Sequence, residues 1–336
     1  MGKVLCFGEI LLRYSMGENF PQQQDITAYI GGAESNVALA LAKWKIPVAY
    51  CTALPDNFLS DTILAYYSKM GVDTTTVIKS GERIGSYYLS QGADVKNVGV
   101  IYDRKYSSFS ELKPSTINWD EVFEGVSWFH FTAISPALNA KIAALCEEAL
   151  ISATKKGITI SLDLNYREKL WNYGVEPIVI MPKLASYAHV IMGNIWAAEK
   201  MLGITLSPNL VASGSDSDLV EQAKKTSESI LEKYPNCNTV ANTFRFNEAE
   251  GVKYFATLYQ QNNIYNSETL FATKPIDRVG TGDCFMGGLI YGILHEKEPQ
   301  QTVEFAARAA YQKLFIKGDA TTSEAEEIEQ LIQKNG

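Results

Sequence analysis

The stretch Asp277–Gly288 reads DRVGTGDCFMGG and is the most informative part of the sequence. Its residues Gly280, Thr281 and Gly282 form a turn of small residues that leads directly into a predicted helix, Asp283–Leu294. The backbone N–H groups at such a helix start have no partner within the helix, so they favour negative charge. Glycines let an anion approach the main chain because no Cβ stands in the way. The sequence therefore predicts an anion-binding turn before a helix.

Asp283 places a carboxylate within this predicted anion-binding turn. A carboxylate at a helix N-terminus is commonly a cap, and that structural role is one interpretation. Phosphoryl transfer offers the other, because a base must accept the proton of the attacking hydroxyl beside the donors that hold the phosphoryl group. The residue types alone support the cap and the base equally.

Short apolar runs alternate with segments of helical periodicity along the rest of the chain. Such alternation indicates βαβ units and a mostly parallel sheet, an α/β fold, and the length of 336 residues suits one large domain or two smaller ones. The predicted strands are Val4–Phe7, Val48–Ala53, Val126–Phe131, Gly157–Leu162 and Val190–Met192. The predicted helices are Ser35–Lys43, Leu59–Lys69, Ala137–Lys155, Asp283–Leu294 and Val303–Phe315, and Ser207–Asp218 is predicted as a loop.

Two regions break this rhythm. Glu82–Leu89 and Asn97–Tyr102 are rich in β-forming residues, with Gly and Asp rather than a helix between them. Together with Arg13–Ile30 they predict a small antiparallel sheet outside the main layer, a lid contributed by about residues 12–30 and 82–106. A lid of this kind covers a substrate, and an ordinary surface hairpin is the equal alternative.

The charge of the chain excludes one class of function. Its formal net charge is −8, whereas a general nucleic-acid binder needs a basic field. A small anionic ligand needs only a few local Arg, Lys or N–H groups. Five scattered Cys without a C-x-x-C pair, and three His, suggest neither a disulfide framework nor a zinc site. No signal peptide and no apolar run of ~18 residues is evident, so no membrane partner and a reducing cytoplasm are expected.

A second glycine-bearing motif lies near the start of the chain, at Gly31–Trp44 (GGAESNVALALAKW). Its two glycines let a sugar pack close to the backbone, and Asn36 offers both a donor and an acceptor to a hydroxyl. Alone, a Gly-Gly turn before an Ala-rich helix is common. The two motifs together are more specific than either one.

Two common nucleotide-binding motifs do not occur in the sequence. The first predicted strand is followed by Gly8–Glu9 rather than by G-x-G-x-x-G, and no βαβ unit with an acidic partner follows Gly280–Gly282. No G-x-x-x-x-G-K-[ST] occurs either, which excludes a P-loop enzyme. A dehydrogenase is therefore the least favoured of the functions considered.

A third motif, Asp163–Trp171 (DLNYREKLW), follows the predicted strand Gly157–Leu162. Ligands sit at the carboxyl ends of strands in open α/β sheets. Arg167 is there a candidate clamp for a carboxylate, since a guanidinium binds two oxygens at once, and a surface salt bridge is the alternative. Tyr87–Tyr88 and Tyr102–Arg104 lie on the predicted lid, where they either close over a polar ligand or pack the lid itself, with packing favoured for Tyr87 over both Tyr88 and Tyr102.

The first two motifs resemble the two signatures of the ribokinase-like (PfkB) sugar kinases, and the resemblance spans essentially the whole chain. The stretch Asp277–Gly288 resembles the family's second signature, which usually reads D-T-x-G-A-G-D-x-F-x-x-G, and here Arg278 and Thr281 replace the usual Thr and Ala. The stretch Gly31–Trp44 resembles the first signature. The resemblance implies a single kinase domain over 1–336, with a three-layer α/β fold, a central, mostly parallel sheet and a small β-sheet lid. It makes Asp283 the catalytic base, and it makes the N–H groups of Gly280, Thr281, Gly282 and Asp283 the anion hole for the γ-phosphate of ATP.

Within that family, the third motif, the GGAE-x-N start and the Y-x-R of the lid resemble the 2-keto-3-deoxygluconate kinases. The resemblance implies ATP-dependent phosphorylation of a sugar acid on its terminal hydroxyl, O6. The residues expected to contact the substrate are Gly32, Asn36, Tyr88, Tyr102, Arg104 and Arg167. Those expected near the nucleotide are Asn165, Asn194, Thr243, Arg245 and Gly318. The resemblance also implies Mg²⁺, K⁺ as a further candidate, and a homo-oligomer with the lid as a candidate interface.

The sequence departs from the family at Ala197, where members often carry the Glu of an N-x-x-E motif that helps to organise Mg²⁺. Glu199 follows two residues later and would point elsewhere on a helix, so no metal ligand is assigned. The strand Val240–Asn247 (VANTFRFN) also lacks the glycines expected near the nucleotide. Two alternatives stay open: a kinase for a neutral sugar such as fructose or ribose, and a catalytically silent sugar-binding homologue. The gluconate and galactonate forms of the substrate are not separable.

Overall fold

A ten-stranded sheet forms the centre of the computed structural model, which describes residues 2–17, 22, 26–90, 99–208, 210, 215–248 and 251–335. The strand order is β15-β14-β13-β12-β11-β10-β1-β4-β6, with β16 beside β14. Every pair from β6 to β13 is parallel and the pairs made by β14 are antiparallel, so the predicted mostly parallel sheet is confirmed. The strands are β1 (Lys3–Phe7), β4 (Val48–Cys51), β6 (Val72–Asp73), β10 (Val126–Thr132), β11 (Thr159–Asp163), β12 (Val190–Gly193), β13 (Thr239–Glu248), β14 (Gly251–Gln260), β15 (Asn263–Asn266) and β16 (Leu270–Thr273).

Strand β1 belongs to two hydrophobic cores at once. Its residues Val4, Leu5, Cys6 and Phe7 are all fully buried, as expected for a strand of a parallel sheet that is covered on both faces. Successive side chains point to opposite faces, so Leu5 and Phe7 join one core while Val4 and Cys6 join the other. The fold therefore has three layers.

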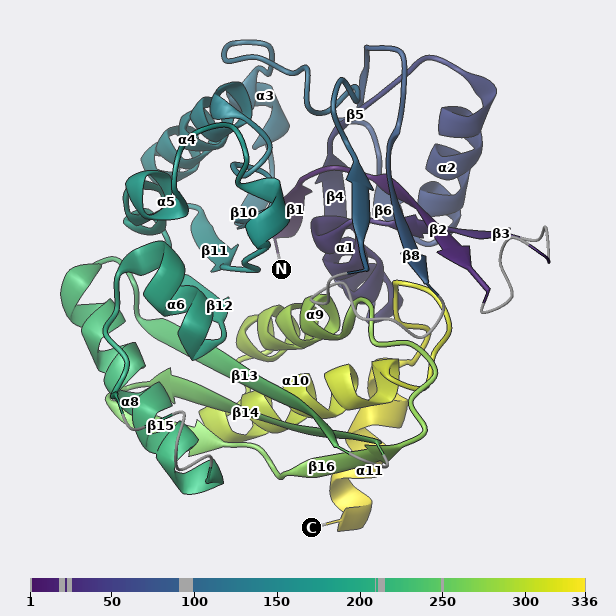
Figure 1. Cartoon of the computed structure of the whole chain (residues 1–336). Helices are drawn as coiled ribbons and strands as arrows, with labels where there is room; N and C mark the ends of the chain where they lie inside the picture. The colour runs from purple at the N-terminus through teal and green to yellow at the C-terminus, as the bar shows by residue number, and fades with distance from the viewer. Residues whose placement is uncertain are drawn as a thin grey trace.

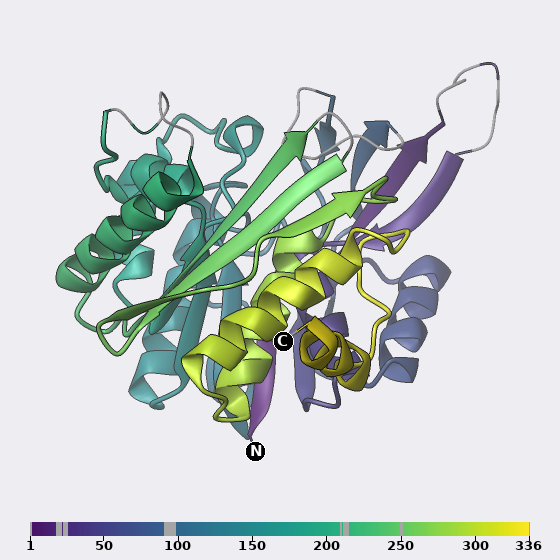
Figure 2. The ribbon, with the colours of Figure 1, turned by 90° about the horizontal axis from the view of Figure 1, so that it is seen from below.

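Helices cover both faces of the sheet (Figures 1 and 2). One core takes in side chains of α3 (Trp119–Val122), α4 (Ala140–Lys155), α5 (Pro177–Ala185) and α6 (Ile195–Leu202). The other takes in side chains of α1 (Ala33–Lys43), α2 (Phe58–Lys69), α9 (Thr281–Leu294), α10 (Pro299–Lys313) and α11 (Ala325–Asn335). A smaller cluster joins α6 to α8 (Asp216–Lys233), β13 and β14. A 3₁₀ turn, η1 (Glu168–Leu170), follows β11.

The helix ends differ from the predictions for local reasons. Helix α4 begins three residues late because the Asn139 side chain accepts the N–H of Ile142 across 3.0 Å and so caps the helix. Helix α8 begins inside the predicted loop Ser207–Asp218, of which residues 209 and 211–214 lie outside the described residues. Helix α9 includes the small-residue turn that was expected to precede it.

The prediction of a strand over Val48–Ala53 is wrong beyond Cys51, where β4 ends. The next short strand, β5 (Ala53–Leu54), pairs instead with β7 (Ile78–Lys79) in a separate two-stranded sheet. A continuous apolar run is compatible with either arrangement, so the break is not visible in the pattern of the sequence.

A four-stranded sheet lies beside the main one, in the order β3-β2-β8-β9. Its strands are β3 (Ile26–Gly31), β2 (Leu11–Met16), β8 (Gly85–Ser90) and β9 (Ile101–Asp103). Strands β2 and β8 run parallel, so the prediction of an antiparallel sheet is wrong for this pair, whereas β2–β3 and β8–β9 are antiparallel. Residues 97 and 98 of the predicted strand Asn97–Tyr102 lie outside the described residues. Figure 2 shows that β2 and β3 extend past the main sheet.

The five cysteines are free thiols, and each of them is buried in one of the two large cores. Burial raises the pKa of Cys51, Cys237 and Cys284 to about 12. In the part of the chain that the structure describes, no helix is both long and apolar enough to cross a membrane.

Candidate active site

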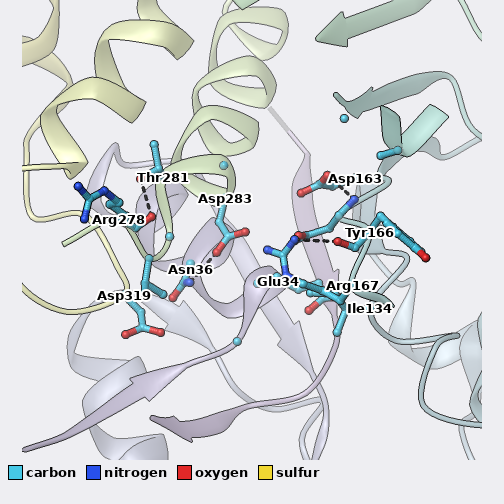
Figure 3. Close-up of a pocket in the computed structure, with 18 of the residues that line it drawn as sticks. Glu34, Asn36, Ile134, Asp163, Tyr166, Arg167, Arg278, Thr281, Asp283 and Asp319 are labelled. Carbon is cyan, nitrogen blue, oxygen red and sulfur yellow. Dashed lines mark hydrogen bonds between the residues drawn. The ribbon is translucent and has the colours of Figure 1, made fainter. Parts of the chain in front are cut away.

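A pocket lies where β11 and β12 end, between the start of α9 and the small sheet (Figure 3). This is the edge at which open parallel sheets bind ligands. Most of the residues predicted for the site line this pocket: Gly32, Asn36, Tyr102, Arg104, Asn165, Arg167, Asn194, Thr243, Arg245, Gly280, Thr281, Gly282 and Asp283. Tyr88 and Gly318 are not among the lining residues.

The turn before α9 depends on glycine at position 280. Gly280 has a left-handed backbone, with φ of 78°, and it is the N-cap residue of the helix. A Cβ built there would lie 1.8 Å from the carbonyl oxygen of Asp319, which is far inside van der Waals contact. The Thr281 hydroxyl donates to the carbonyl of Arg278 across 2.8 Å and closes the turn. The small residues thus let the chain enter the helix with its first N–H groups at the pocket wall.

Asp283 lies in the first turn of α9 and is 9% exposed. Its Oδ2 accepts a hydrogen bond of 2.7 Å from Nδ2 of Asn36, and no side chain caps the helix. The cap interpretation of Asp283 is therefore wrong for this structure. The pKa of Asp283 is raised to about 8, mainly by burial; Asn36 and Arg167 oppose the rise, and the nearby Asp163 adds to it. The carboxyl group is thus poised between its two protonation states near neutral pH.

Figure 3 shows Asp283 facing Asn36, with Arg167 and Tyr166 on the other side of the carboxylate. The Asn36 Oδ1 atom is buried without a hydrogen-bond partner among the described residues. A buried polar atom without a partner is costly, and a ligand hydroxyl would satisfy it. The Arg167 guanidinium donates to the carbonyl of Tyr166 across 3.0 Å and is partly exposed at the pocket.

The two predicted cationic partners of a substrate differ in their surroundings. The Arg104 Nε donates to Oε2 of Glu9 across 2.6 Å, and both side chains are almost completely buried. The charge of Arg104 is therefore already balanced within the protein, although the residue lines the pocket. Arg167 donates to a backbone carbonyl instead, so its charge is the more available to an anionic ligand.

Several acidic residues of the pocket were missed by the sequence analysis. Glu34 Oε1 accepts hydrogen bonds from the backbone N–H and hydroxyl of Thr132 and from the hydroxyl of Ser135, and burial raises its pKa. Asp163 Oδ1 accepts the N–H of Asn165 across 3.0 Å at the end of β11. Both residues stand inside quoted motifs, GGAES and DLN, so their position in those motifs was the available signal.

Tyr87, rather than the predicted Tyr88, lines the pocket from the small sheet. Its hydroxyl donates to Oδ2 of Asp319 across 2.7 Å. The neighbouring Tyr88 stacks on Tyr14, with ring centroids 5.3 Å apart, on the opposite face of the small sheet. Strand alternation explains the difference, since Tyr87 shares its face with the buried Leu89.

The residues predicted for the nucleotide fall into two groups. Thr243 and Arg245 lie on β13 and line the pocket together with the anion-binding turn Gly280–Asp283. The Arg245 guanidinium donates to the carbonyl of Arg278, just before that turn, across 3.1 Å. Asn194 lines the pocket while its Oδ1 caps α6 by accepting the N–H of Ala197 across 2.8 Å. Gly318 lies outside the pocket lining, although its neighbour Asp319 is part of it.

A divalent ion would have few protein ligands in this pocket. Ala197 lies in the lining, at the position that carries Glu in the N-x-x-E motif. Among the described residues, no group of three His, Cys, Asp or Glu side chains could hold a metal ion. Mg²⁺ usually keeps several waters and is bound through one or two carboxylates and the substrate phosphates. Asp163 and Asp283 both line the pocket and fit that mode of binding.

A buried carboxylate beside an anion-binding helix start, at the carboxyl ends of parallel strands, suits the transfer of a phosphoryl group to a hydroxyl. The sequence matches the pfkB family of carbohydrate kinases over residues 1–326. The chain therefore belongs to the pfkB family, and it is a carbohydrate kinase.

Proteins similar to this chain cover its whole length. The crystal structure of 2-dehydro-3-deoxygluconokinase from Thermotoga maritima is 35% identical, with a TM-score of 0.90, and the match covers 99% of this chain and 100% of that one. A 2-dehydro-3-deoxygalactonokinase of Haloferax volcanii is 26% identical over 333 residues, 98% of this chain and 96% of the relative. A fructokinase of Xylella fastidiosa with bound ATP is 20% identical, with a TM-score of 0.77 and coverage of 99% and 98%. The predicted ribokinase-like fold is confirmed by the match at 35% identity, and the match to the fructokinase shows a shared fold alone.

Proposed function

We propose that this kinase transfers the γ-phosphoryl group of ATP to the terminal hydroxyl, O6, of 2-keto-3-deoxygluconate or of its galactonate epimer, giving the 6-phosphate. The observation that carries the proposal is the placement of Asp283, a buried carboxylate beside an anion-binding turn with the Arg167 guanidinium nearby. The turn suits a phosphoryl group, the carboxylate suits a hydroxyl, and the guanidinium suits the carboxylate of a sugar acid. The names of the T. maritima and H. volcanii relatives support this substrate class.

In the proposed reaction, the ionised Asp283 accepts the proton of the sugar hydroxyl while Asn36 holds the other carboxylate oxygen. The hydroxyl oxygen forms a bond to the γ-phosphorus, the bond from that phosphorus to the β–γ bridging oxygen breaks, and ADP leaves. The N–H groups of Gly280–Asp283 donate to the oxygens of the transferred group, where negative charge is concentrated. Arg245, on β13, lies at the nucleotide side of this turn and contributes positive charge.

Mg²⁺ fits the pocket as an ion carried by the phosphates of ATP rather than one held in a cage of protein ligands. When bound, the ion neutralises phosphate charge. Asp163, at the end of β11, is the residue that we assign to it, because its carboxylate lines the pocket next to that of Asp283. A dependence on K⁺ stays an expectation, which parallel assays in potassium and tetramethylammonium salts would test.

We further propose that the small sheet is the lid of a single kinase domain. Tyr87, Tyr102 and Arg104 line the pocket from this sheet or directly after it. A lid over the pocket excludes water, which would otherwise accept the phosphoryl group. Ile26 and Ile101 are exposed on the sheet and make it a candidate surface for self-association. The molar mass of the protein and of an Ile101→Asp variant in solution, by light scattering, would test this interface.

A neutral sugar such as fructose or ribose is the second candidate substrate, and one observation favours it. Arg104 is paired with the buried Glu9, which leaves a single predicted clamp, Arg167, for a carboxylate. A coupled ADP-release assay across sugars and sugar acids separates the two candidates. Preference for the 2-keto-3-deoxy acids, with ³¹P NMR locating the phosphate on O6, supports the proposal.

Higher kcat/KM for fructose or ribose in the same assay would overturn the sugar-acid assignment. No turnover with any sugar in the panel would favour a silent sugar-binding homologue. Comparison of the gluconate and galactonate epimers in that assay also assigns the stereochemistry, on which the two relatives differ by name.

A further inference from the structure

A buried arginine on the small sheet holds two carboxylates that flank the anion turn. The Arg13 side chain, on β2, is 3% exposed. Its Nη2 and Nη1 donate to the two carboxylate oxygens of Asp277 across 2.7 Å and 3.2 Å. Its Nε lies 2.8 Å from Oδ1 of Asp319 without pointing at it, so that contact is an ion pair rather than a hydrogen bond. One guanidinium therefore ties together two segments on either side of Gly280.

Both carboxylates are part of the support of the turn. Asp277 Oδ1 accepts the N–H of Val279 across 3.1 Å, and its Oδ2 accepts the N–H of Gly318 across 3.2 Å. The main chain of Asp319 packs directly against Gly280, where it leaves no room for a Cβ. A displacement of either acidic residue would therefore move the backbone that presents the N–H groups of the turn.

The small sheet reaches the same place through a second side chain. The Tyr87 hydroxyl, on β8, donates to Oδ2 of Asp319, so β2 and β8 contact one carboxylate. Arg13 itself does not line the pocket, whereas Tyr87 and Asp319 do. An effect of Arg13 on a bound ligand must therefore pass through the residues that it holds.

The cluster contains a second buried cation. Lys313, on α10, is fully buried, and its Nζ donates to the carbonyl of Ile316 across 3.0 Å. Its Cε lies 3.4 Å from the position that a Cβ on Gly280 would occupy. Burial lowers the pKa of the Lys313 ammonium, and Asp277 and Asp319 oppose this by favouring its charged form. Burying such charges is costly, and apolar residues often stabilise a core as well, so stability alone gives little reason for the cluster.

We propose that Arg13 is a positioning residue, which fixes the anion-binding turn Gly280–Asp283 relative to the small sheet by holding Asp277 and Asp319. This inference deepens the proposed function and rests on it, since the turn is there assigned to the transferred phosphoryl group. It accounts for the two-oxygen contact with Asp277, which orients as well as attracts. Loss of the guanidinium removes no residue of the pocket lining, but it removes the support behind the turn.

The kinetic test compares Arg13→Met and Arg13→Lys with a matched control. Displacing a catalytic group by about 1 Å costs on the order of 100-fold in rate, so Arg13→Met is expected to lower kcat by about 10- to 100-fold. The KM for the sugar substrate should stay within about twofold, because no substrate contact is removed. Arg13→Lys should recover part of the lost kcat, since its charge persists without the planar fork.

The matched control is Arg308→Met. Arg308 is also a buried arginine in an ion pair, 2.6 Å from Glu268, but it is not among the residues that line the pocket. Its removal should leave kcat within about twofold of the parent. Parent-like kcat in both Arg13 variants would overturn the inference, as would an equal loss in Arg308→Met. Should Arg13→Met fail to fold, Arg13→Lys decides on its own.

A binding measurement separates this inference from the proposed substrate. The affinities of ADP and of the non-hydrolysable ATP analogue AMP-PNP are measured by calorimetry with Mg²⁺ and without sugar. The ratio of the two reports what the turn adds through the γ-phosphoryl group. The ratio should fall by about tenfold in Arg13→Lys and stay unchanged in Arg308→Met. An unchanged ratio in both counts against Arg13, whereas a missing turnover of sugar acids in the parent counts against the substrate alone.

Discussion

Asn36 donates a hydrogen bond of 2.7 Å to Asp283, although the two residues lie 247 positions apart in the chain. Each stands in the first turn of a helix, Asn36 in α1 and Asp283 in α9. The bond stabilises the ionised carboxylate against the burial that raises its pKa. The two motifs singled out in the sequence therefore meet in one contact, and that contact opposes the rise in the pKa of Asp283.

The pH dependence of kcat/KM should follow the ionisation of Asp283. Burial raises its pKa from 3.8 to about 8, and a base acts only when deprotonated. The value of kcat/KM should therefore rise with pH through neutrality and level off above about 8. A profile that is already flat between pH 5 and 7 would contradict this assignment.

Two substitutions should shift the rising limb of the kcat/KM–pH profile in opposite directions. Asn36→Leu removes a donor to the ionised form, so the limb should shift to higher pH. Asp163→Asn removes a neighbouring negative charge, so the limb should shift to lower pH. The position of the limb is the readout, because both variants also alter the pocket and lower the plateau. Shifts in the same direction would show that another group titrates.

Asp283→Asn should lose activity and gain stability. Without the base, kcat should fall by at least about 100-fold in the coupled assay. A carboxyl whose pKa is raised on folding favours the native state below its unfolded pKa near 4, and this contribution is lost as pH rises toward about 8. The variant should therefore melt above the parent at pH 8, and the difference should vanish near pH 4. A lower melting temperature for the variant at pH 8 would contradict the burial penalty.

Gly280→Ala should damage the anion turn through both backbone and packing. The left-handed conformation costs a non-glycine residue about 1–2 kcal/mol, and the new Cβ would collide with the carbonyl oxygen of Asp319. Gly125→Ala is the matched control, since its φ is 70° but no atom lies within 4 Å of the added Cβ. The free energy of unfolding, measured with denaturant, and kcat should both fall more in Gly280→Ala than in Gly125→Ala. Equal losses in the two would mean that the contact with Asp319 does not matter.

The two pocket arginines should respond differently to substitution. Arg167→Leu should raise the KM for a sugar acid by about tenfold or more, with neutral sugars unaffected, because a charged hydrogen bond is lost. Arg104→Met should instead lower the free energy of unfolding by about 3–5 kcal/mol, since it leaves Glu9 buried without its partner. The double variant with Glu9→Gln should recover part of this loss. Steady-state kinetics and chemical unfolding of the same variants separate the outcomes, and an unchanged KM in Arg167→Leu would remove the proposed clamp.

The local features of the fold and site were predictable from the sequence. The small-residue turn Gly280–Gly282 was expected before a helix; Gly280 is the N-cap of α9, and Thr281 and Gly282 are its first two residues. The alternation of apolar runs predicted the parallel sheet, because such strands are buried on both faces. Motif residues such as Asn36 and Asp283 came together because helix starts and strand ends meet at one edge of the sheet.

The features that depend on pairing between distant segments were not predictable in the same way. Whether Tyr87 or Tyr88 lines the pocket depends on which face of β8 is turned toward the pocket. The alternation of side chains along the strand does not tell the two faces apart. The neutralisation of Arg104 depends on Glu9, which is 95 positions away. Asp319 joins the site only because its loop packs against Gly280. Each of these contacts is set by tertiary structure rather than by local pattern.

Because all five thiols are buried, the rate at which they are covalently labelled reports how often the structure opens. Alkylating reagents attack the thiolate, and burial both shields these sulfurs and disfavours their ionisation. Native protein should therefore resist iodoacetamide, and each modified molecule records an opening of one of the two layers flanking the sheet. Because Cys51 and Cys284 belong to opposite layers, mass spectrometry of the modified peptides distinguishes a layer that opens alone from one that opens with its neighbour.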